Sequence, residues 1–391
     1  MRIKTLKLPG LLVVLALLLA ACGAQPTQAF PGLTADEELV FLAQGNQLRV
    51  VDLATGQQKW AFPNPAAAGV TGSFASQPAV EGDLVVAGSE GPANAHSGSV
   101  FGIDRNTGAQ KWCLVFDEKS FKRLAPFGCR QAQVTKETGL FGFSVAVDNR
   151  ILGGIALVDG QAFFGLSSGA VYAVDAATGR DLWHFNAERD IWSTPVVTED
   201  TVYVTSLDHH VYALNRATGA QRWKADMGAT VAGTPTLYED TLYVGTFGNI
   251  LAALDADTGE QIWTFATTNW VWDGPAVLDN TLYFADVGGT VYAIDADERT
   301  PVWPPRKPGG AMRARPTVTE DWLFVGDRSG NLFALERGSG AVAWTKTLKG
   351  EILVTPAVVN DLVVVATFSG ANLLEAYTTN GDFKWPFAPT N

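Results

Sequence analysis

Short apolar runs alternate with turn residues along almost the whole chain. Typical runs are Thr241-Leu-Tyr-Val and Asp361-Leu-Val-Val-Val. Aromatic and β-branched residues fill these runs, and Gly, Asp, Asn and Thr separate them, which is the pattern of short strands joined by tight turns. The middle runs are apolar at nearly every position, which indicates sheets buried on both faces. No stretch keeps a helical period between capping residues, so we expect an all-β fold.

The strand pattern is an internal repeat. The clearest copies end in Ala-x-Asp-x-x-Thr-Gly-x-x-x-Trp or a close variant, with Trp183, Trp223 and Trp263 spaced 40 residues apart. Eight tryptophans close such segments: Trp60, Trp112, Trp183, Trp223, Trp263, Trp303, Trp344 and Trp385. Repeats of about 40 residues with four strands each are typical of propeller blades. The sequence predicts a single eight-bladed β-propeller of four-stranded antiparallel blades over residues 30–391, with its first inner strand near Pro31–Thr34.

The repeated turn and the tryptophan have separate physical roles. Asp or Asn opens the turn by accepting backbone N–H bonds, and glycine adopts a positive φ that a side chain disfavours. Glu298-Arg299 replaces Thr-Gly in one repeat, so we expect an irregular turn there. The tryptophan is large and apolar, and we expect all eight to dock between neighbouring blades.

The N-terminus is typical of an exported lipoprotein. Arg2, Lys4 and Lys7 precede an apolar stretch from Leu8 to Ala20, which is short for a membrane span but suits a signal peptide. Leu19-Ala20-Ala21-Cys22 resembles a bacterial lipobox, which implies a signal peptide over residues 1–21 and lipid on Cys22. Residues 22–29 are small and polar, as in a flexible tether. The alternative is an ordinary secretory signal.

Charge and cysteine usage agree with export. The net charge of −12 argues against nucleic-acid binding and against electrostatic attraction to anionic lipid. With Cys22 lipidated, Cys113 and Cys129 remain as an even pair, which favours a disulfide in an oxidising compartment. Two separate buried thiols are the alternative.

The tryptophan motif resembles the docking motif of the pyrroloquinoline-quinone (PQQ)-like propellers, over nearly all the chain beyond residue 30. That family includes calcium- and PQQ-dependent alcohol dehydrogenases and non-catalytic envelope lipoproteins of the BamB type. The dehydrogenases carry adjacent cysteines, which this chain lacks. The Asp255-Ala-Asp257 and Asp295-Ala-Asp297 pairs lack the later glycine and glutamate of a calcium loop, and turn chemistry explains them better. We therefore expect no metal and no cofactor, with PQQ and calcium only under the dehydrogenase alternative.

Three insertions depart from the repeat length. They lie in residues 61–77, 88–99 and about 113–147, the last containing both paired cysteines. Two of them join one blade to the next and the third joins a second strand to a third strand. In an antiparallel four-stranded blade those connections share one edge, so we expect all three on one face of blades 1–3, as a functional surface. Neutral drift of exposed loops is the alternative.

The same face should receive the residues just before the inner strands. Trp192, Trp272, Arg313 and Arg315 are the candidates for a ligand or partner site, with Trp270 nearby. They can stack on a planar anionic cofactor, anchor a protein partner, or only pack the mouth of the ring. We interpret Asp208-His209-His210 as a solvated loop, because adjacent residues of an extended chain point apart.

These observations favour a non-catalytic, lipid-anchored scaffold that binds other envelope proteins. The resemblance places it in the cell envelope, on an outer membrane facing the periplasm or on the cell surface. Two alternatives remain open, a PQQ-dependent dehydrogenase or its degenerate relative, and the sensor part of a signalling system.

Overall fold

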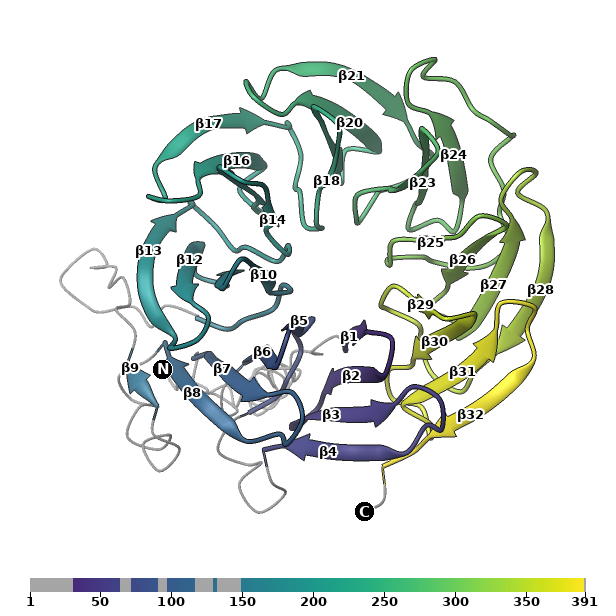
Figure 1. Cartoon of the computed structure of the whole chain (residues 1–391). Coiled ribbons are helices and arrows are strands. Elements are labelled where there is room, and N and C mark those ends of the chain that lie inside the picture. Colours follow the sequence, from purple (N-terminus) through teal and green to yellow (C-terminus); the bar gives the residue numbers. More distant parts are fainter. Residues whose placement is uncertain (1–30, 64–71, 91–96, 117–128, 132–148, 390–391) are drawn as a thin grey trace, which may run out of the picture.

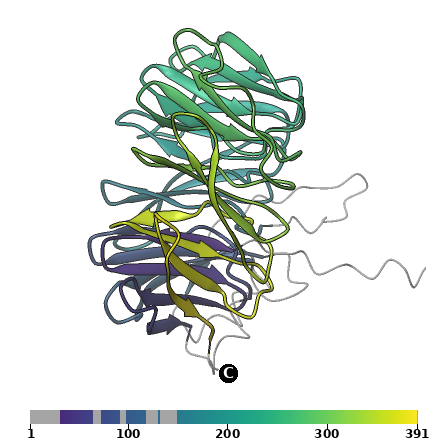
Figure 2. The same ribbon diagram turned by 90° about the vertical axis from the view of Figure 1, so that its right-hand side faces the viewer.

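The structure, a computed structural model, describes residues 31–63, 72–90, 97–116, 129–131 and 149–389. Eight antiparallel sheets stand around a central axis as the blades of one ring (Figure 1). A view turned by 90° shows the ring from its side, with strands running across its thickness (Figure 2). The prediction of an all-β, eight-bladed propeller is confirmed. The signal peptide over residues 1–21, the tether over 22–29, Cys22 and most of the 113–147 insertion lie outside the described residues.

Each blade is built from consecutive strands, ordered outward from the axis. The inner strands are β1 (Gly32–Ala35), β5 (Ala79–Glu81), β10 (Ala156–Val158), β14 (Val196–Val197), β18 (Thr236–Tyr238), β22 (Ala276–Leu278), β25 (Thr317–Val318) and β29 (Ala357–Val359). The second strands are β2 (Leu39–Gln44), β6 (Leu84–Ser89), β11 (Gln161–Gly165), β15 (Thr201–Thr205), β19 (Thr241–Gly245), β23 (Thr281–Ala285), β26 (Trp322–Gly326) and β30 (Leu362–Ala366).

The third strands are β3 (Gln47–Asp52), β7 (Ser99–Asp104), β12 (Ala170–Asp175), β16 (His210–Asn215), β20 (Ile250–Asp255), β24 (Val291–Asp295), β27 (Asn331–Glu336) and β31 (Leu374–Thr378). The outer strands are β4 (Gln58–Phe62), β8 (Gln110–Val115), β13 (Arg180–Asn186), β17 (Gln221–Asp226), β21 (Gln261–Ala266), β28 (Val342–Thr347) and β32 (Phe383–Phe387). The second and third strands are almost fully buried, because neighbouring blades cover both of their faces.

Blades 2 and 6 depart from four strands. Blade 2 has a fifth strand, β9 (Arg130–Gln131), which pairs in parallel with the outer edge of β8. Blade 6 forms a sheet of three strands, β22 to β24. Its outer segment contains Pro301, Pro304 and Pro305, which have no N–H to donate, and isolated bridges such as Val291↔Arg306 replace a continuous ladder.

Tryptophan docking joins the blades. The indole N–H of each of seven tryptophans donates to a carbonyl in the turn of the next blade at 2.7–3.0 Å. The ring also lies against the glycine of that turn, so that a Cβ added at Gly259 would lie 2.7 Å from the Trp223 ring. Glycine is therefore required both for its positive φ and for the close approach of the indole.

The expectation of an irregular turn at Glu298-Arg299 is wrong. Arg299 takes the glycine position with a φ of 59°, and its N–H donates to the Asp295 carbonyl at 2.9 Å, as Gly259 donates to Asp255 at 2.8 Å. The turn is thus regular, because the Asp295 side chain accepts the same backbone bonds that hold the other turns. What changes is the docking, since among the described residues no hydrogen bond joins the Trp263 indole to this turn. A cavity of about 270 Å³ opens there instead, lined by Trp263, Ala296, Arg299 and their neighbours.

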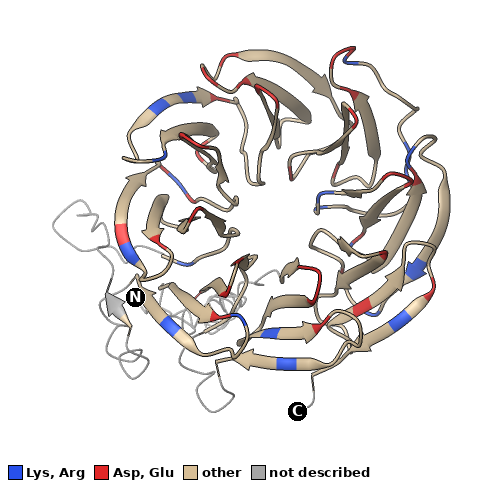
Figure 3. Cartoon of the chain, in the orientation of Figure 1, with Lys and Arg blue, Asp and Glu red and all other residues tan. Residues whose placement is uncertain are grey.

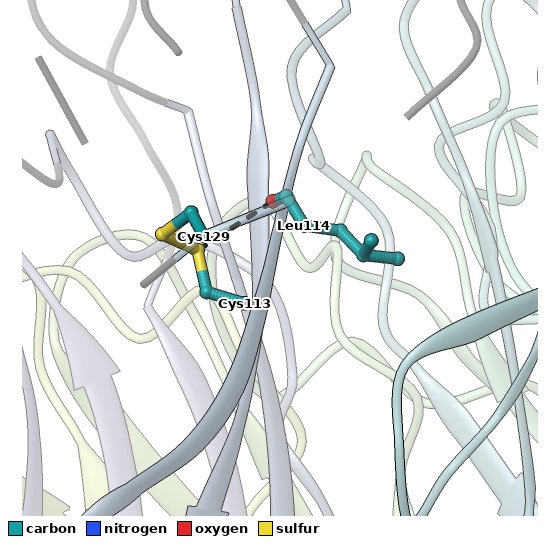
Figure 4. The surroundings of a disulfide bond; sticks show 3 residues. All are labelled: Cys113, Leu114 and Cys129. Carbon is teal, nitrogen blue, oxygen red and sulfur yellow. Dashed lines mark hydrogen bonds between the residues drawn. A yellow bond between two sulfur atoms is a disulfide. The ribbon is translucent and has the colours of Figure 1, made fainter. Parts of the chain in front are cut away.

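Cys113 and Cys129 form a disulfide, with their Cα atoms 4.5 Å apart (Figure 4). Cys113 lies in β8 and Cys129 directly precedes β9. The bond therefore holds Cys129, near the middle of the inserted segment, against the outer edge of blade 2.

The ring has two different faces. We call turn face the one formed by the hairpins between inner and second strands and by the turns between third and outer strands. We call loop face the opposite one, formed by the connections from second to third strands and from each outer strand to the next blade. The part of the chain that the structure describes contains no helix long and apolar enough to cross a membrane.

Candidate functional site

Aromatic side chains and an arginine form a continuous row on the loop face of blades 5 to 7. The rings of Phe247 and Trp270 stack with centroids 4.8 Å apart and 6° between their planes, and Phe247 also contacts Trp272 at 5.2 Å. The Arg313 guanidinium lies over the Trp272 ring, 4.7 Å from its centroid. We call Phe247, Trp270, Trp272 and Arg313 the aromatic row.

Three different connections supply the row. Phe247 follows β19, both tryptophans lie between β21 and β22, and Arg313 lies ahead of β25. Backbone bonds join neighbouring connections, for example from the Val271 N–H to the Thr246 carbonyl at 3.0 Å. The row is therefore a property of the assembled ring and not of any one repeat.

Arg315 points to a different group of residues. Its Nη2 donates to the Thr234 carbonyl at 3.3 Å and lies 3.6 Å from Asp273, so it reaches from blade 7 past blade 6 to blade 5. Burial raises the pKa of the Asp273 carboxyl, although the charge of Arg315 acts in the opposite direction. The pair links three inner-strand segments and is therefore a structural crosslink near the axis.

The sequence candidates thus separate into two groups. The structure brings Trp272 and Arg313 together, while Arg315 belongs to the Asp273 crosslink. Trp192 lies in the connection between β13 and β14, where its indole N–H donates to Asp190 at 3.3 Å. Trp192 therefore lies where blade 3 connects to blade 4, whereas the aromatic row lies over blades 5 to 7.

These residues do not fit a quinone and calcium site. Arg313 covers one face of the Trp272 ring, and Arg315 is engaged by Asp273 and Thr234. Calcium takes roughly six to eight oxygen ligands. Within the described ranges no group of three or more His, Cys, Asp or Glu side chains is placed to hold a metal ion.

The Asp208-His209-His210 loop has a structural explanation. The Asp208 carboxylate accepts bonds from the Tyr212 hydroxyl at 2.7 Å and from the backbone N–H of Glu188 at 3.0 Å. Burial raises the pKa of Asp208, but these bonds and the one from the His210 N–H outweigh it and lower the pKa overall. The carboxylate therefore stabilises its own loop.

Charge is divided unevenly over the ring. Acidic residues follow the hairpins of the turn face, and lysines and arginines lie along outer strands such as β4, β8 and β17 (Figure 3). On the loop face, residues 307–316, 327–330 and 348–353 contain the five cations Lys307, Arg313, Arg315, Arg328 and Lys349, and the two carboxylates Asp327 and Glu351. Of these cations Arg315 is paired with Asp273, and Arg328 is paired with Glu351.

The predicted insertions begin on the same face as the row. The connections after β4 and β8 lead from an outer strand to the next blade, and the connection after β6 leads from a second to a third strand. By the strand order of the blades, the described ends of all three lie on the loop face. The inserted residues 64–71, 91–96, 117–128 and 132–148 lie outside the described part.

Two residues of this region were not identified as site residues from the sequence. Phe247 follows a second strand at the position that Leu207, Val287 and Arg328 occupy in other repeats, so an aromatic residue there was the available signal. Asp273 directly precedes Gly274-Pro275, where a carboxylate is unusual among the repeats. Neither signal identifies its partner, because the partners come from other blades.

The family model described as "Outer membrane protein assembly factor BamB" matches residues 20–125, 122–229, 167–269, 208–316 and 288–390. A curated relative, outer membrane protein assembly factor BamB of Shewanella oneidensis, is 41% identical over 76 residues, which is 19% of this chain and 19% of that protein. Serine/threonine-protein kinase AfsK of Streptomyces griseus is 29% identical over 101 residues, 26% of this chain and 11% of the kinase. The chain thus spans only a small part of each of these curated relatives.

Two solved structures share the fold. The crystal structure of BamB from Moraxella catarrhalis has a TM-score of 0.64 at 17% identity and covers 88% of this chain and 92% of that one. The computationally designed Ika8 protein has a TM-score of 0.68 at 13% identity and covers 90% of this chain and 98% of that one. At these identities the likeness concerns the fold alone.

Proposed function

Because this chain belongs to the family described as outer membrane protein assembly factor BamB, whose model matches it in overlapping segments from residue 20 to residue 390, we propose that it is a non-catalytic scaffold that binds other proteins of the cell envelope. Its loop face is the binding surface. Lipid on Cys22 attaches it to a membrane, and the ring lies on the periplasmic side of an outer membrane or on the cell surface. No cofactor is required for this role.

One observation carries the proposal. The three connections that exceed the repeat length start on the same face of the ring as the aromatic row. Tryptophan and arginine dominate the energetics of protein interfaces, and connections grow on functional faces. A lipid anchor suits such a protein because it holds the face near membrane-bound partners.

Deletion of residues 132–147 tests the binding role. This deletion leaves β8, β9 and the Cys113–Cys129 disulfide in place, so the ring should keep its unfolding midpoint. We expect capture of envelope partners from detergent-solubilised membranes to be lost. The control is the double variant Glu199→Gln, Asp200→Asn on the turn face, which should capture normally. Unchanged capture by the deletion variant contradicts the proposed surface.

Enzyme activity and lipidation are tested separately. Purified protein supplied with PQQ, calcium and an alcohol should not reduce a dye, and reduction above the level of heat-denatured protein would favour the dehydrogenase alternative over the scaffold.

Mass spectrometry should show that the mature protein begins at an acylated Cys22. Cys22→Ser should release the protein from the membrane fraction, and a variant that stays membrane-bound argues against the anchor.

A further inference from the structure

Two neighbouring blade junctions differ in one residue of the repeated turn. Each contains a tyrosine of the second strand, a docking tryptophan and the residue after the turn aspartate: Tyr203, Trp223 and Ala256 between blades 4 and 5, and Tyr243, Trp263 and Ala296 between blades 5 and 6. At the turn glycine, Arg299 takes the place of Gly259. The comparison therefore shows what the arginine does to a junction.

The arginine leaves a backbone carbonyl and an indole N–H without protein partners. Between blades 4 and 5 the Ala256 carbonyl accepts bonds from Trp223 at 3.0 Å and from Tyr203 at 3.1 Å. Between blades 5 and 6, no hydrogen bond within the described ranges reaches the Ala296 carbonyl or starts from the Trp263 indole. A buried polar group costs about 1–3 kcal/mol unless water or a ligand supplies its hydrogen bond.

Both of these groups line the cavity of about 270 Å³ at this junction, which opens on the turn face. Its wall also contains the rings of Tyr238 and Tyr243 and the side chain of Ile262, which is 43% exposed. The rings of Tyr243 and Trp263 are in edge contact, with centroids 5.9 Å apart. Pockets for drug-sized ligands measure about 300–1,000 Å³, so this cavity suits a smaller ligand with an apolar part.

One part of the cavity is negative. Two carboxylates, Glu239 and Asp297, belong to its lining, and Asp297 accepts a bond from Asn280 at 3.0 Å. Burial raises the pKa of the Tyr243 hydroxyl against a hydrogen bond with Thr241, and the charges of both carboxylates add to the rise. In the described chain Glu239 makes no ion pair and no side-chain hydrogen bond. This part of the cavity therefore favours a cationic group.

The third charged residue of the lining is positive. Arg299 is exposed, and no ion pair or hydrogen bond holds its guanidinium in the part of the chain that the structure describes. Because a Cβ at Gly259 would lie 2.7 Å from the Trp223 ring, the Arg299 side chain leaves the backbone beside the Trp263 indole. A guanidinium and an indole N–H are thus close together, and both donate to a carboxylate.

We propose that the cavity between blades 5 and 6 binds a free α-amino acid with an apolar side chain. The ligand carboxylate pairs with Arg299 and accepts from the Trp263 indole. Its ammonium group pairs with Glu239 and donates to the Ala296 carbonyl, and its side chain packs beside Ile262. A ligand with a single charge would leave Glu239 or Arg299 uncompensated. The site lies on the face opposite the proposed partner surface and is independent of it.

Isothermal titration calorimetry of the purified protein with L-leucine tests the site. We expect one site per chain. Leucinamide, which lacks the carboxylate, and N-acetyl-leucine, which lacks the ammonium group, should each bind about tenfold more weakly. Glu239→Gln and Arg299→Met should each weaken leucine binding about tenfold while keeping the unfolding midpoint.

The matched control is Glu320→Gln, which should bind leucine like the unaltered protein. Glu320 holds in blade 7 the position of Glu239 in blade 5, beside a junction where the Trp344 indole donates to the Thr379 carbonyl at 3.0 Å. Arg299→Gly separates binding from folding. It should let the Trp263 indole dock into the cavity, so leucine binding is lost while the urea midpoint rises.

The opposite results overturn the inference. These are no binding of leucine, valine or phenylalanine, equal binding of leucine and its two singly charged derivatives, leucine binding that persists in Arg299→Gly, or an equal loss in the Glu320→Gln control. None of them affects the scaffold proposal, which concerns the loop face.

Discussion

Single residues of the repeated turn decide how one blade meets the next. Asp175 accepts bonds from both the N–H and the hydroxyl of Thr178, and Gly179 leaves room for the Trp112 ring. Asn215 makes the same pair of bonds with Thr218, so an amide serves as well as a carboxylate at this position. The glycine is harder to replace, because it has to supply both a positive φ and free space.

Arg299→Gly should stabilise the protein. The substitution removes a non-glycine residue from positive φ and clears the space into which the Trp263 indole would dock, a gain of about 1 kcal/mol from each effect. Urea unfolding followed by tryptophan fluorescence measures it. The matched reverse variant is Gly259→Arg, which should destabilise, since a Cβ there meets Trp223 at 2.7 Å. If Arg299→Gly lowers stability, Arg299 is not the reason why the Trp263 indole makes no hydrogen bond to this turn.

The turn aspartates should make stability fall in acid. The Lys59 ammonium and the Thr55 hydroxyl lower the pKa of Asp52 from 3.8 to about 2, and the Thr178 hydroxyl lowers the pKa of Asp175. Because folding lowers these pKa values, the stabilisation is complete above the unfolded value near 3.8 and is lost as the pH falls toward about 2.

The double variant Asp52→Asn, Asp175→Asn checks this effect. It keeps turns of the kind that Asn215 forms but cannot be protonated. Its melting temperature should fall less between pH 4 and pH 2 than that of the unaltered protein. Glu298→Gln, which removes an exposed turn carboxylate, is the control and should follow the unaltered protein. Parallel curves for all three proteins would refute the assignment.

At the level of strands, the third and outer strands are shaped around the tryptophan. Ala173 faces Trp183 across the pair, and the register shifts directly after it. The same shift follows Ala213 opposite Trp223 and Ala253 opposite Trp263. A small residue leaves room for the indole, and the bulge turns the strand so that the indole points to the neighbouring blade. The alanine of the repeat motif is therefore a packing requirement.

Replacing a docking tryptophan by phenylalanine should distinguish blade junctions in which the indole donates a hydrogen bond to the next turn from the one in which it does not. Trp183→Phe removes the bond from the indole to the Arg216 carbonyl and should cost about 1 kcal/mol or more, because it leaves a buried acceptor without its donor. Trp263→Phe should cost markedly less, since that indole donates to no carbonyl of the next turn in the described part of the chain. Denaturant unfolding gives both values. Equal losses would mean that the indole bond does not distinguish the junctions.

At the scale of the whole molecule, the ring closes without exchanging strands. Blade 1 is completed by its own β1, as expected from Pro31–Thr34, and blade 8 consists of β29 to β32. The closing contacts include the bond from Trp385 to the Leu53 carbonyl at 2.9 Å, the bond from Gln44 to the Thr367 carbonyl at 3.1 Å, and an apolar cluster shared by both blades. No peptide connection links blade 8 to blade 1, unlike the other junctions.

Trp385→Ala should therefore loosen the ring locally. Truncation of a buried tryptophan costs about 3–5 kcal/mol. We expect faster amide exchange in β1, β2, β29 and β30 and a broadened unfolding transition. Trp183→Ala is the matched control, because its two blades stay joined by the chain and should exchange together with the rest. Uniform exchange in both variants would show that closure is as robust as any other junction.

Local chemistry is what the sequence determined by itself. The period of the tryptophan motif fixed the number of blades, alternating apolar runs and turns fixed the strands, and the spacing of the insertions indicated one face. These follow from sequence because each depends on residues within one repeat. The disulfide was also predictable, since only two cysteines remained once Cys22 was set aside.

Contacts between blades were decided only by the tertiary structure. Phe247, Trp272 and Arg313 come from three blades, and no single repeat carries a sign of their contact. Arg299 kept its turn regular, because hydrogen bonds to Asp295 decide the turn, and it changed the docking of Trp263 instead. Arg315 contacts Asp273 and Thr234 and is not part of the row, because a partly buried guanidinium pairs with the nearest carboxylate and carbonyl. A repeat specifies its own strands and turns, whereas a binding surface built from several repeats depends on how the closed ring brings them together.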